Sequence, residues 1–217
     1  MTQSSLSMAA QVYDAIRERI CSGQYLPGIH LVEADLAAEF HVSRITVRDA
    51  LRRLAADELV EVLPYRGVRV RQLTTQDVEE LYTVREPIES LAARLAAEVR
   101  GEGLKDLRRI CQEGAQAAAA GDARRYMQLN AQFHATVPAI TGNRTLVKVL
   151  THLNTQMVGY QFLSAINLER MQQSQSQHEA VLRAIEAGDG DRAESAMRHH
   201  IRTSRAEFRA GLADVAV

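Results

Sequence analysis

The sequence has few aromatic residues: tryptophan is absent, and Phe, Trp and Tyr together make up 5% of its 217 residues. Hydrophobic residues still make up 46%, many of them alanine, so the chain has enough apolar side chains for a core. Alanine is the strongest helix former, and this composition therefore favours a mainly helical fold. The length suits one large domain or two small ones.

Cysteine is also scarce. Cys21 and Cys111 are the only two, and they lie far apart without Cys-x-x-Cys spacing, which excludes a disulfide framework and indicates a reduced, cytoplasmic protein. The N-terminal segment lacks the apolar centre of a signal peptide. No apolar run approaches the length of a membrane span, so we expect no membrane partner.

An excess of one charge is missing as well. The chain carries 26 basic and 27 acidic residues, for a formal net charge of -1, which by itself indicates no particular partner. The distribution is uneven, however, because residues 41–71 contain seven arginines against four acids. Residues 41–71 are therefore a locally basic part of a chain whose total charge is close to zero.

The spacing of apolar residues divides the chain into two parts. The first predicts three helices, the last two separated by a three-residue turn, and then a hairpin; the second predicts helices alone. Helices are expected at 8–22, 33–40, 43–57, 76–100, 103–120, 122–141, 143–167, 170–187 and 189–213, and strands at 59–63 and 68–71. We therefore expect a mainly α protein with a winged helix-turn-helix over 1–71, a linker over 72–75, and an all-α antiparallel helical bundle over 76–217.

The helix within HVSRITVRDALRRL carries its arginines outside its apolar face. Val47, Ala50, Leu51, Leu54 and Ala55 follow the spacing of one buried stripe. The outward residues then include arginines and one aliphatic residue, Ile45, where solvation alone predicts a polar side chain. Either this is an ordinary solvated helix or it enters a DNA major groove, where Arg binds guanine and an aliphatic group contacts the thymine methyl.

The segment LAAEFHVSRITVRDALRRLAADELVEVLPYRGVRV resembles the winged helix-turn-helix of the GntR family of bacterial transcriptional regulators. The resemblance rests on VSR-x-x-VR-x-AL-x-x-L and on RG-V-x-V in the hairpin, called the wing. Two positions depart from the family pattern, because Thr46 replaces a frequent proline and Glu58 replaces the glycine that usually closes the helix. With the outward face taken into account, the expected DNA-binding residues are Ser43, Arg44, Ile45, Thr46, Arg48, Arg52, Arg66 and Gly67.

In the second part, polar residues interrupt apolar stripes on several helices. A lone histidine on such a stripe is usually a hydrogen-bonded core residue. Three of them together with an amide suggest instead a site for a divalent metal, and the four are Asn130, His134, His178 and His200. Arg85 falls on another stripe, where its partner is either Glu89 four residues later or the carboxylate of a bound effector.

Residues 76–213 resemble the effector domain of the FadR subfamily, the FCD domain, in its six-helix form. The resemblance rests on LYTVREPIESLAARLA, on N-x-x-x-H as it stands in NAQFH, and on H-x-x-VL-x-AI-x-x-GD. It implies a metal held by Asn130, His134, His178 and His200, with zinc as the first choice and nickel or manganese as alternatives. It also implies that Arg85, with Tyr82 beside it, binds the effector. Many members have Asp where this chain has Asn130.

The two resemblances together imply a homodimeric transcription repressor, not an enzyme. It would bind a palindromic operator in double-stranded DNA and respond to a small carboxylate effector. One alternative keeps the regulator but gives it a metal-free, apolar effector pocket. A second alternative is a small metal-dependent hydrolase, which would leave the N-terminal part unexplained.

Overall fold

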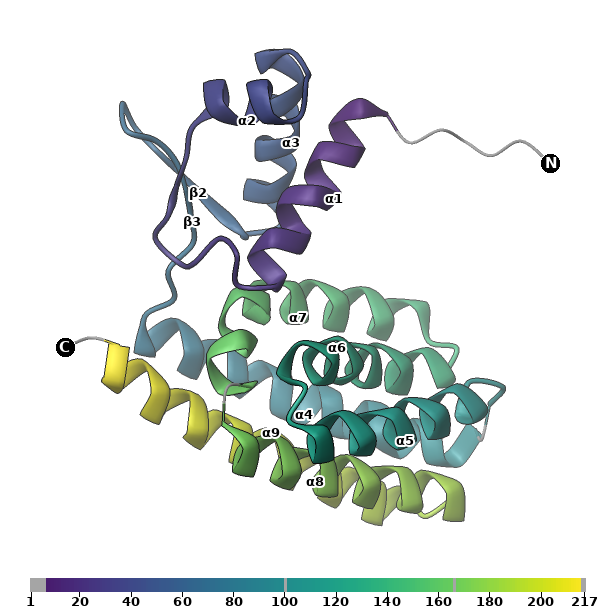
Figure 1. Cartoon of the computed structure of the whole chain (residues 1–217). Coiled ribbons are helices and arrows are strands. Elements are labelled where there is room, and N and C mark those ends of the chain that lie inside the picture. Colours follow the sequence, from purple (N-terminus) through teal and green to yellow (C-terminus); the bar gives the residue numbers. More distant parts are fainter. Residues whose placement is uncertain (1–6, 100, 166, 216–217) are drawn as a thin grey trace. The chain divides into compact units, whose positions relative to one another are not determined.

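A computed structural model describes residues 7–99, 101–165 and 167–215 of the chain (Figure 1). The chain divides between Leu73 and Thr74 into two compact units, and the Thr155–Phe162 stretch does not belong to the second. The described part is mainly helical, with one small sheet, as the sequence predicts. None of its helices is long and apolar enough to cross a membrane.

The first unit combines three helices with a three-stranded antiparallel sheet of order β1-β3-β2. The hairpin pairs Val60 with Val70 and Leu63 with Gly67, and its strand β2 packs against α3 (Figure 1). Strand β1 was not predicted, because its two residues are too few to show an alternation. The elements are α1 (Met8–Cys21), β1 (His30–Leu31), α2 (Glu33–Glu39), α3 (Arg44–Ala56), β2 (Val60–Leu63) and β3 (Gly67–Val70).

The core of the first unit fixes the orientation of α3. Val47, Leu51 and Leu54 are fully or almost fully buried, and they pack in one cluster with Ile16 and Ile20 of α1. Burying an aliphatic side chain of this size stabilises a fold by about 1.5–3 kcal/mol. The apolar stripe of α3 is thus committed to the core, and the opposite face remains exposed.

Two residues other than glycine close the helices α2 and α3 in the left-handed conformation. His41 follows α2 with φ 54°, and Glu58 follows α3 with φ 57°. After each, the chain folds back in the same way: Val42 N–H donates to Ala37 and Leu59 N–H to Leu54. This hydrogen bond from the residue after the left-handed position is the Schellman motif. Glu58 therefore ends α3 as a glycine would, at a cost in backbone strain.

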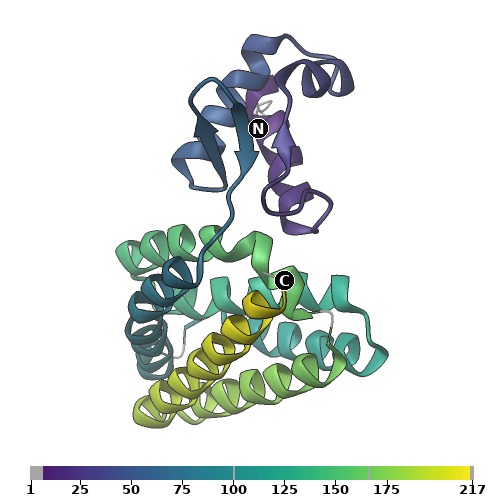
Figure 2. The same ribbon diagram turned by 90° about the vertical axis from the view of Figure 1, so that its left-hand side faces the viewer.

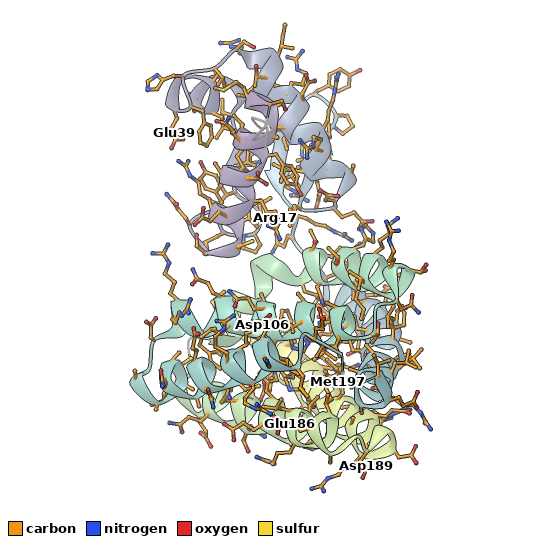
Figure 3. All side chains as sticks on the ribbon, turned by 90° about the vertical axis from the view of Figure 1, so that its right-hand side faces the viewer. Arg17, Glu39, Asp106, Glu186, Asp189 and Met197 are labelled. Atoms are coloured by element: carbon orange, nitrogen blue, oxygen red, sulfur yellow. The ribbon has the colours of Figure 1, made fainter. Side chains whose placement is uncertain are left out.

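The second unit is a bundle of helices (Figure 2). Ala-Gly-Asp occurs at two of its turns, where Gly121 (φ 69°) and Gly188 (φ 73°) end one helix, and Asp122 and Asp189 cap the next (Figure 3 labels Asp189). The same three residues therefore form the same turn twice. The helices are α4 (Thr75–Val99), α5 (Leu104–Ala120), α6 (Ala123–Ile140), α7 (Arg144–Ala165), α8 (Leu168–Ala187) and α9 (Gly190–Val215).

Helix α4 is apolar on two faces. Its inward face carries Val78, Tyr82 and the alanines from Ala92 to Ala97, and this face packs mainly against α9. The apolar spacing of this helix predicts that Leu91 and Val99 lie on the same stripe, but they are 46% and 55% exposed. The prediction is wrong because the helix also carries a second row of aliphatic residues, and this row is partly exposed.

Candidate nucleic-acid interface and metal centre

Helix α3 begins with a hydroxyl cap. Ser43 Oγ accepts a hydrogen bond from Thr46 N–H at 3.1 Å, and the two side-chain hydroxyls lie 2.9 Å apart. Such a cap satisfies an amide that the first turn leaves without a helical partner. It fixes the start of the helix, where Arg44 follows in an exposed position. Ser43 is therefore a structural cap whatever its contact with DNA.

The outward face of α3 carries Arg44, Ile45, Arg48 and Arg52, all exposed. Ile45 is 71% exposed, which agrees with the outward position that its spacing predicts. Arg48 has a partner that the sequence did not reveal: its Nε and Nη2 atoms donate to the two carboxylate oxygens of Glu33 on α2, at 3.1 and 2.8 Å. This bidentate pair orients the guanidinium plane and leaves its Nη1–Nη2 edge directed away from Glu33.

The wing presents a short exposed tip between β2 and β3. Arg66 and Gly67 are exposed there, and Gly67 has φ 85°. Tyr65 precedes them, fully exposed and also in the left-handed conformation, with φ 60°. Arg66 and Gly67 are predicted DNA-binding residues and Tyr65 is not, although an aromatic residue in a polar turn is a visible signal.

In the second unit, His134, His178 and His200 bring their Nε2 atoms together from α6, α8 and α9. The Nε2 atom of His200 lies 3.2 Å from that of His134 and 3.3 Å from that of His178. All three side chains are buried. Met197, three residues before His200, marks the same inward side of α9 (Figure 3). The three predicted histidines thus form one cluster.

The other ring nitrogens determine which tautomer two of these imidazoles adopt. His134 Nδ1 lies 2.6 Å from Glu89 Oε2, and His200 Nδ1 lies 2.9 Å from Gln177 Oε1. Gln177 in turn donates from Nε2 to Thr203 Oγ1, which fixes its amide orientation. A carboxylate and an amide oxygen only accept, so both Nδ1 atoms must carry the hydrogen. Both Nε2 atoms then present lone pairs.

Two lone pairs 3.2 Å apart cannot form a hydrogen bond with each other, and a metal ion beside them would be held by both His134 and His200. Burial, followed by His134, lowers the pKa of His200 to about 3, and burial with its two neighbours holds that of His178 well below its usual value, so both of these imidazoles are neutral. Neutral imidazoles oriented through Nδ1 are the usual donors to a divalent metal. The residues present therefore fit such an ion.

Arg85 and Tyr82, the expected effector-binding residues, are both buried on α4. Arg85 donates from Nε to Glu89 Oε1 at 2.9 Å, and its guanidinium lies 5.0 Å from the ring centre of Tyr82. Burial alone would raise the pKa of Glu89, but Arg85 and His134 outweigh it and hold the value at about 2. Glu89 is thus the partner of Arg85 that the sequence left open, and it joins Arg85 to the histidine cluster.

Asn130 lies one helical turn before His134 on α6 and is half-buried. Three other residues of the site were missed or only partly recognised. Gln177 and Glu89 orient two of the imidazoles, and Phe133 stacks on His178 with ring centres 3.9 Å apart. Proximity in sequence to a histidine pointed to Phe133 and Gln177, and the four-residue spacing from Arg85 pointed to Glu89.

Comparison with known proteins agrees with both units. Residues 8–70 match the family described as "Bacterial regulatory proteins, gntR family", and residues 80–203 match the FCD domain. The chain belongs to the GntR family. As a GntR regulator with an FCD domain, it binds DNA through its helix-turn-helix, and its buried histidine cluster accords with a metal site typical of FCD domains.

Similar regulators cover almost the whole chain. The probable D-xylose utilization operon transcriptional repressor of Paenarthrobacter nicotinovorans is 30% identical over 90% of this chain and 86% of its own length. The transcriptional repressor RspR of Escherichia coli K12 is 26% identical over 88% and 84%. The structure of E. coli McbR/YncC superposes with a TM-score of 0.82 at 21% identity, over 94% and 98%. The relatives are transcriptional regulators, and this GntR regulator is likewise not an enzyme.

Proposed function

We propose that this GntR regulator is a metal-containing repressor, released from a palindromic operator by a small carboxylate effector. The observation that carries the proposal is the pair of imidazoles whose lone pairs face each other at 3.2 Å, held in that tautomer by Glu89 and Gln177. Repression is supported by the names of two relatives, the repressors of a D-xylose utilization operon and of the gluconate operon of Bacillus licheniformis.

The DNA-binding surface consists of the exposed face of α3 and the tip of the wing. Arg48 is the residue for guanine recognition, because Glu33 orients its guanidinium and the Nη1–Nη2 edge matches O6 and N7 of guanine. Ile45 provides an apolar contact for a thymine methyl. Arg44, Arg52, Arg66, Ser43 and Thr46 provide phosphate contacts, and Gly67 allows the backbone to approach closely.

The Nε2 atoms of His134, His178 and His200, together with the amide oxygen of Asn130, would hold the metal. A set of nitrogen donors favours zinc, with nickel or manganese as alternatives. When bound, the metal supplies a Lewis acid for an effector carboxylate. Arg85 lies behind this site, joined to it by Glu89, so that a change at the effector reaches both α4 and α6.

The outward row on α4 is the proposed dimer interface. Val84, Leu91 and Val99 are each 45% to 55% exposed, and Ile88 and Leu95 are half-buried between them. Spacings of three and four residues give the seam of a helix pair. A second copy of the chain would cover this seam with its own, as closed two-fold symmetry requires. Two winged domains would then meet two half-sites.

Metal analysis of protein purified without a histidine tag tests the metal. We expect about one equivalent per chain, and a fall in melting temperature after a chelator that is restored by zinc. His178→Ala should abolish both the bound metal and the effect of the chelator on melting temperature. His199→Ala, next to the cluster on α9, should keep both. If the purified protein held no metal and its melting temperature did not change with chelator, the result would instead support the metal-free pocket.

Footprinting on duplexes selected from a random pool tests the DNA surface. Arg44→Ala and Arg48→Ala should each abolish protection while leaving the melting temperature of the protein unchanged, because both side chains are exposed. Protection by both variants at the wild-type concentration would show that α3 is not the recognition helix.

A further inference from the structure

The charges around the histidine cluster cancel before any ligand is added. Arg85 and Glu89 are 3% and 2% exposed and form a buried ion pair. Both oxygens of Glu89 are in use, one by Arg85 and the other by His134 Nδ1. Glu89 therefore neutralises Arg85 and has no oxygen left to ligate a metal.

The donor set itself carries no negative charge. Among the described residues, the group whose ligand atoms converge contains three histidines and neither an acid nor a cysteine. Asn130, which would extend the set from the same face of α6, is a neutral amide. The half-buried carboxyl of Glu207 on α9 has its own positive neighbour, Arg170. A divalent ion would thus add two positive charges that the protein does not offset.

An uncompensated charge in a buried site is costly, and the ligand is the remaining source of negative charge. We propose that the effector is a dicarboxylate, selected over monocarboxylates because its two negative charges balance the metal. This inference rests on the proposed function and narrows its effector class. It also assigns Asn130 a role in specificity: an amide at this position leaves the second charge to be supplied by the effector.

Titration calorimetry on the zinc-loaded full chain tests the inference with matched probes. Malonate, succinate and glutarate are each compared with the half-amide in which one carboxylate is replaced by a neutral group of the same shape. For the diacid of best-fitting length, we expect a Kd about tenfold or more below that of its half-amide. Chelator-treated protein should lose this preference.

A variant that moves one negative charge onto the protein provides a second measurement. Asn130→Asp should reduce the preference for the diacid by about tenfold, chiefly by improving binding of the half-amide. Asn143→Asp is the matched control, because Asn143 is an exposed cap of α7 and Asp caps a helix equally well. It should leave both Kd values unchanged.

Equal binding of a diacid and its half-amide by the wild-type protein would overturn the inference and leave the proposed carboxylate effector standing. An unchanged preference in Asn130→Asp would also overturn it. Failure of all six compounds to bind zinc-loaded protein would contradict the carboxylate effector itself, and the inference with it.

Discussion

Arg48 shows how a single residue acquires a role that its own position does not reveal. Its charge follows from the residue type and its outward direction from the apolar spacing of α3. The orientation of its guanidinium, however, comes from Glu33 on another helix. Burial alone would raise the pKa of Glu33, but the hydrogen bond from Arg48 is the larger effect and lowers it, so the pair remains charged at neutral pH. A guanidinium oriented in this way loses less conformational freedom when it binds a base.

Glu33→Gln should therefore weaken specific binding more than non-specific binding. We expect about a tenfold loss of affinity for a selected duplex, while affinity for a scrambled duplex is kept or rises because a negative charge is removed. Glu39→Gln removes the same charge from the other end of α2, where Glu39 pairs with Arg19. Electrophoretic mobility shifts of both variants on both duplexes make the comparison. If Glu33→Gln increased the affinity for both duplexes equally, Glu33 would act only by repelling DNA.

Glu89 joins two buried groups of the second unit, the guanidinium of Arg85 and the imidazole of His134. Glu89→Gln would leave the guanidinium of Arg85 buried without a counter-ion, and we expect a loss of about 3 kcal/mol in the free energy of unfolding. Zinc affinity should fall by about 10-fold or more, because the acceptor for His134 Nδ1 is weakened. Urea unfolding of metal-free protein and zinc titration measure the two effects separately.

The control for Glu89→Gln lies on the same helix. Glu98 pairs with Arg94 in the same i, i+4 arrangement, but both side chains are largely exposed. Glu98→Gln should leave stability and zinc affinity nearly unchanged, because solvent already screens that pair. A similar effect of both substitutions would mean that the Arg85–Glu89 pair has no special importance.

At the scale of the elements, α2 and α3 both end in a Schellman motif, with His41 at the left-handed position after α2 and Glu58 after α3. In the family pattern a glycine closes the recognition helix, whereas this chain has Glu58 after α3. The structure keeps the Schellman hydrogen bonds and forces Glu58 into the left-handed region instead. A side chain in that region costs about 1–2 kcal/mol, which glycine avoids. Tertiary packing of α3 against α1 and the hairpin thus overrides the local preference.

Glu58→Gly should consequently be more stable than Glu58→Ala. Both variants lose the ion pair with Arg71, so their difference isolates the backbone, and we expect about 0.5–1 kcal/mol in favour of glycine. The unfolding transition of the first unit, induced by heat or urea, gives the difference in free energy of unfolding between the two variants. Alanine equal to or better than glycine would contradict the left-handed conformation.

At the scale of the whole molecule, the outward row on α4 is the feature that a single chain does not explain. A helix exposing Val84, Leu91 and Val99 to water gains nothing within the chain. A partner copy that buries this row would also bring a second recognition helix to the same DNA. The second unit would then set the spacing between half-sites, although it does not itself contact the bases.

Leu91→Glu should dissociate the proposed dimer, because a charge in a self-complementary seam would meet the same charge of the second copy. Leu168→Glu is the control: Leu168 on α8 is 48% exposed, close to the 46% of Leu91, but lies outside the row. Light scattering after gel filtration should report a monomer for the first variant and a dimer for the second. A dimer in both would place the interface elsewhere.

Local rules predicted most of the fold. The spacing of apolar residues predicted nine helices and a hairpin within a few residues of those in the described chain. Strand β1 escaped because it is held by pairing with β3 and not by a pattern of its own. The outward row of α4 was assigned to the core because periodicity shows that a face is apolar, but not what covers it.

The sequence by itself determined the elements and the residue types that each face carries: arginines and Ile45 on the outward side of α3, and histidines on the inward sides of α6, α8 and α9. Only the tertiary structure decided which groups meet. It placed Glu89 between Arg85 and His134, turned Gln177 toward His200, and set two imidazole lone pairs 3.2 Å apart. The physical reason is range: helical periodicity acts over a few residues, whereas tautomer and charge depend on neighbours brought together by packing.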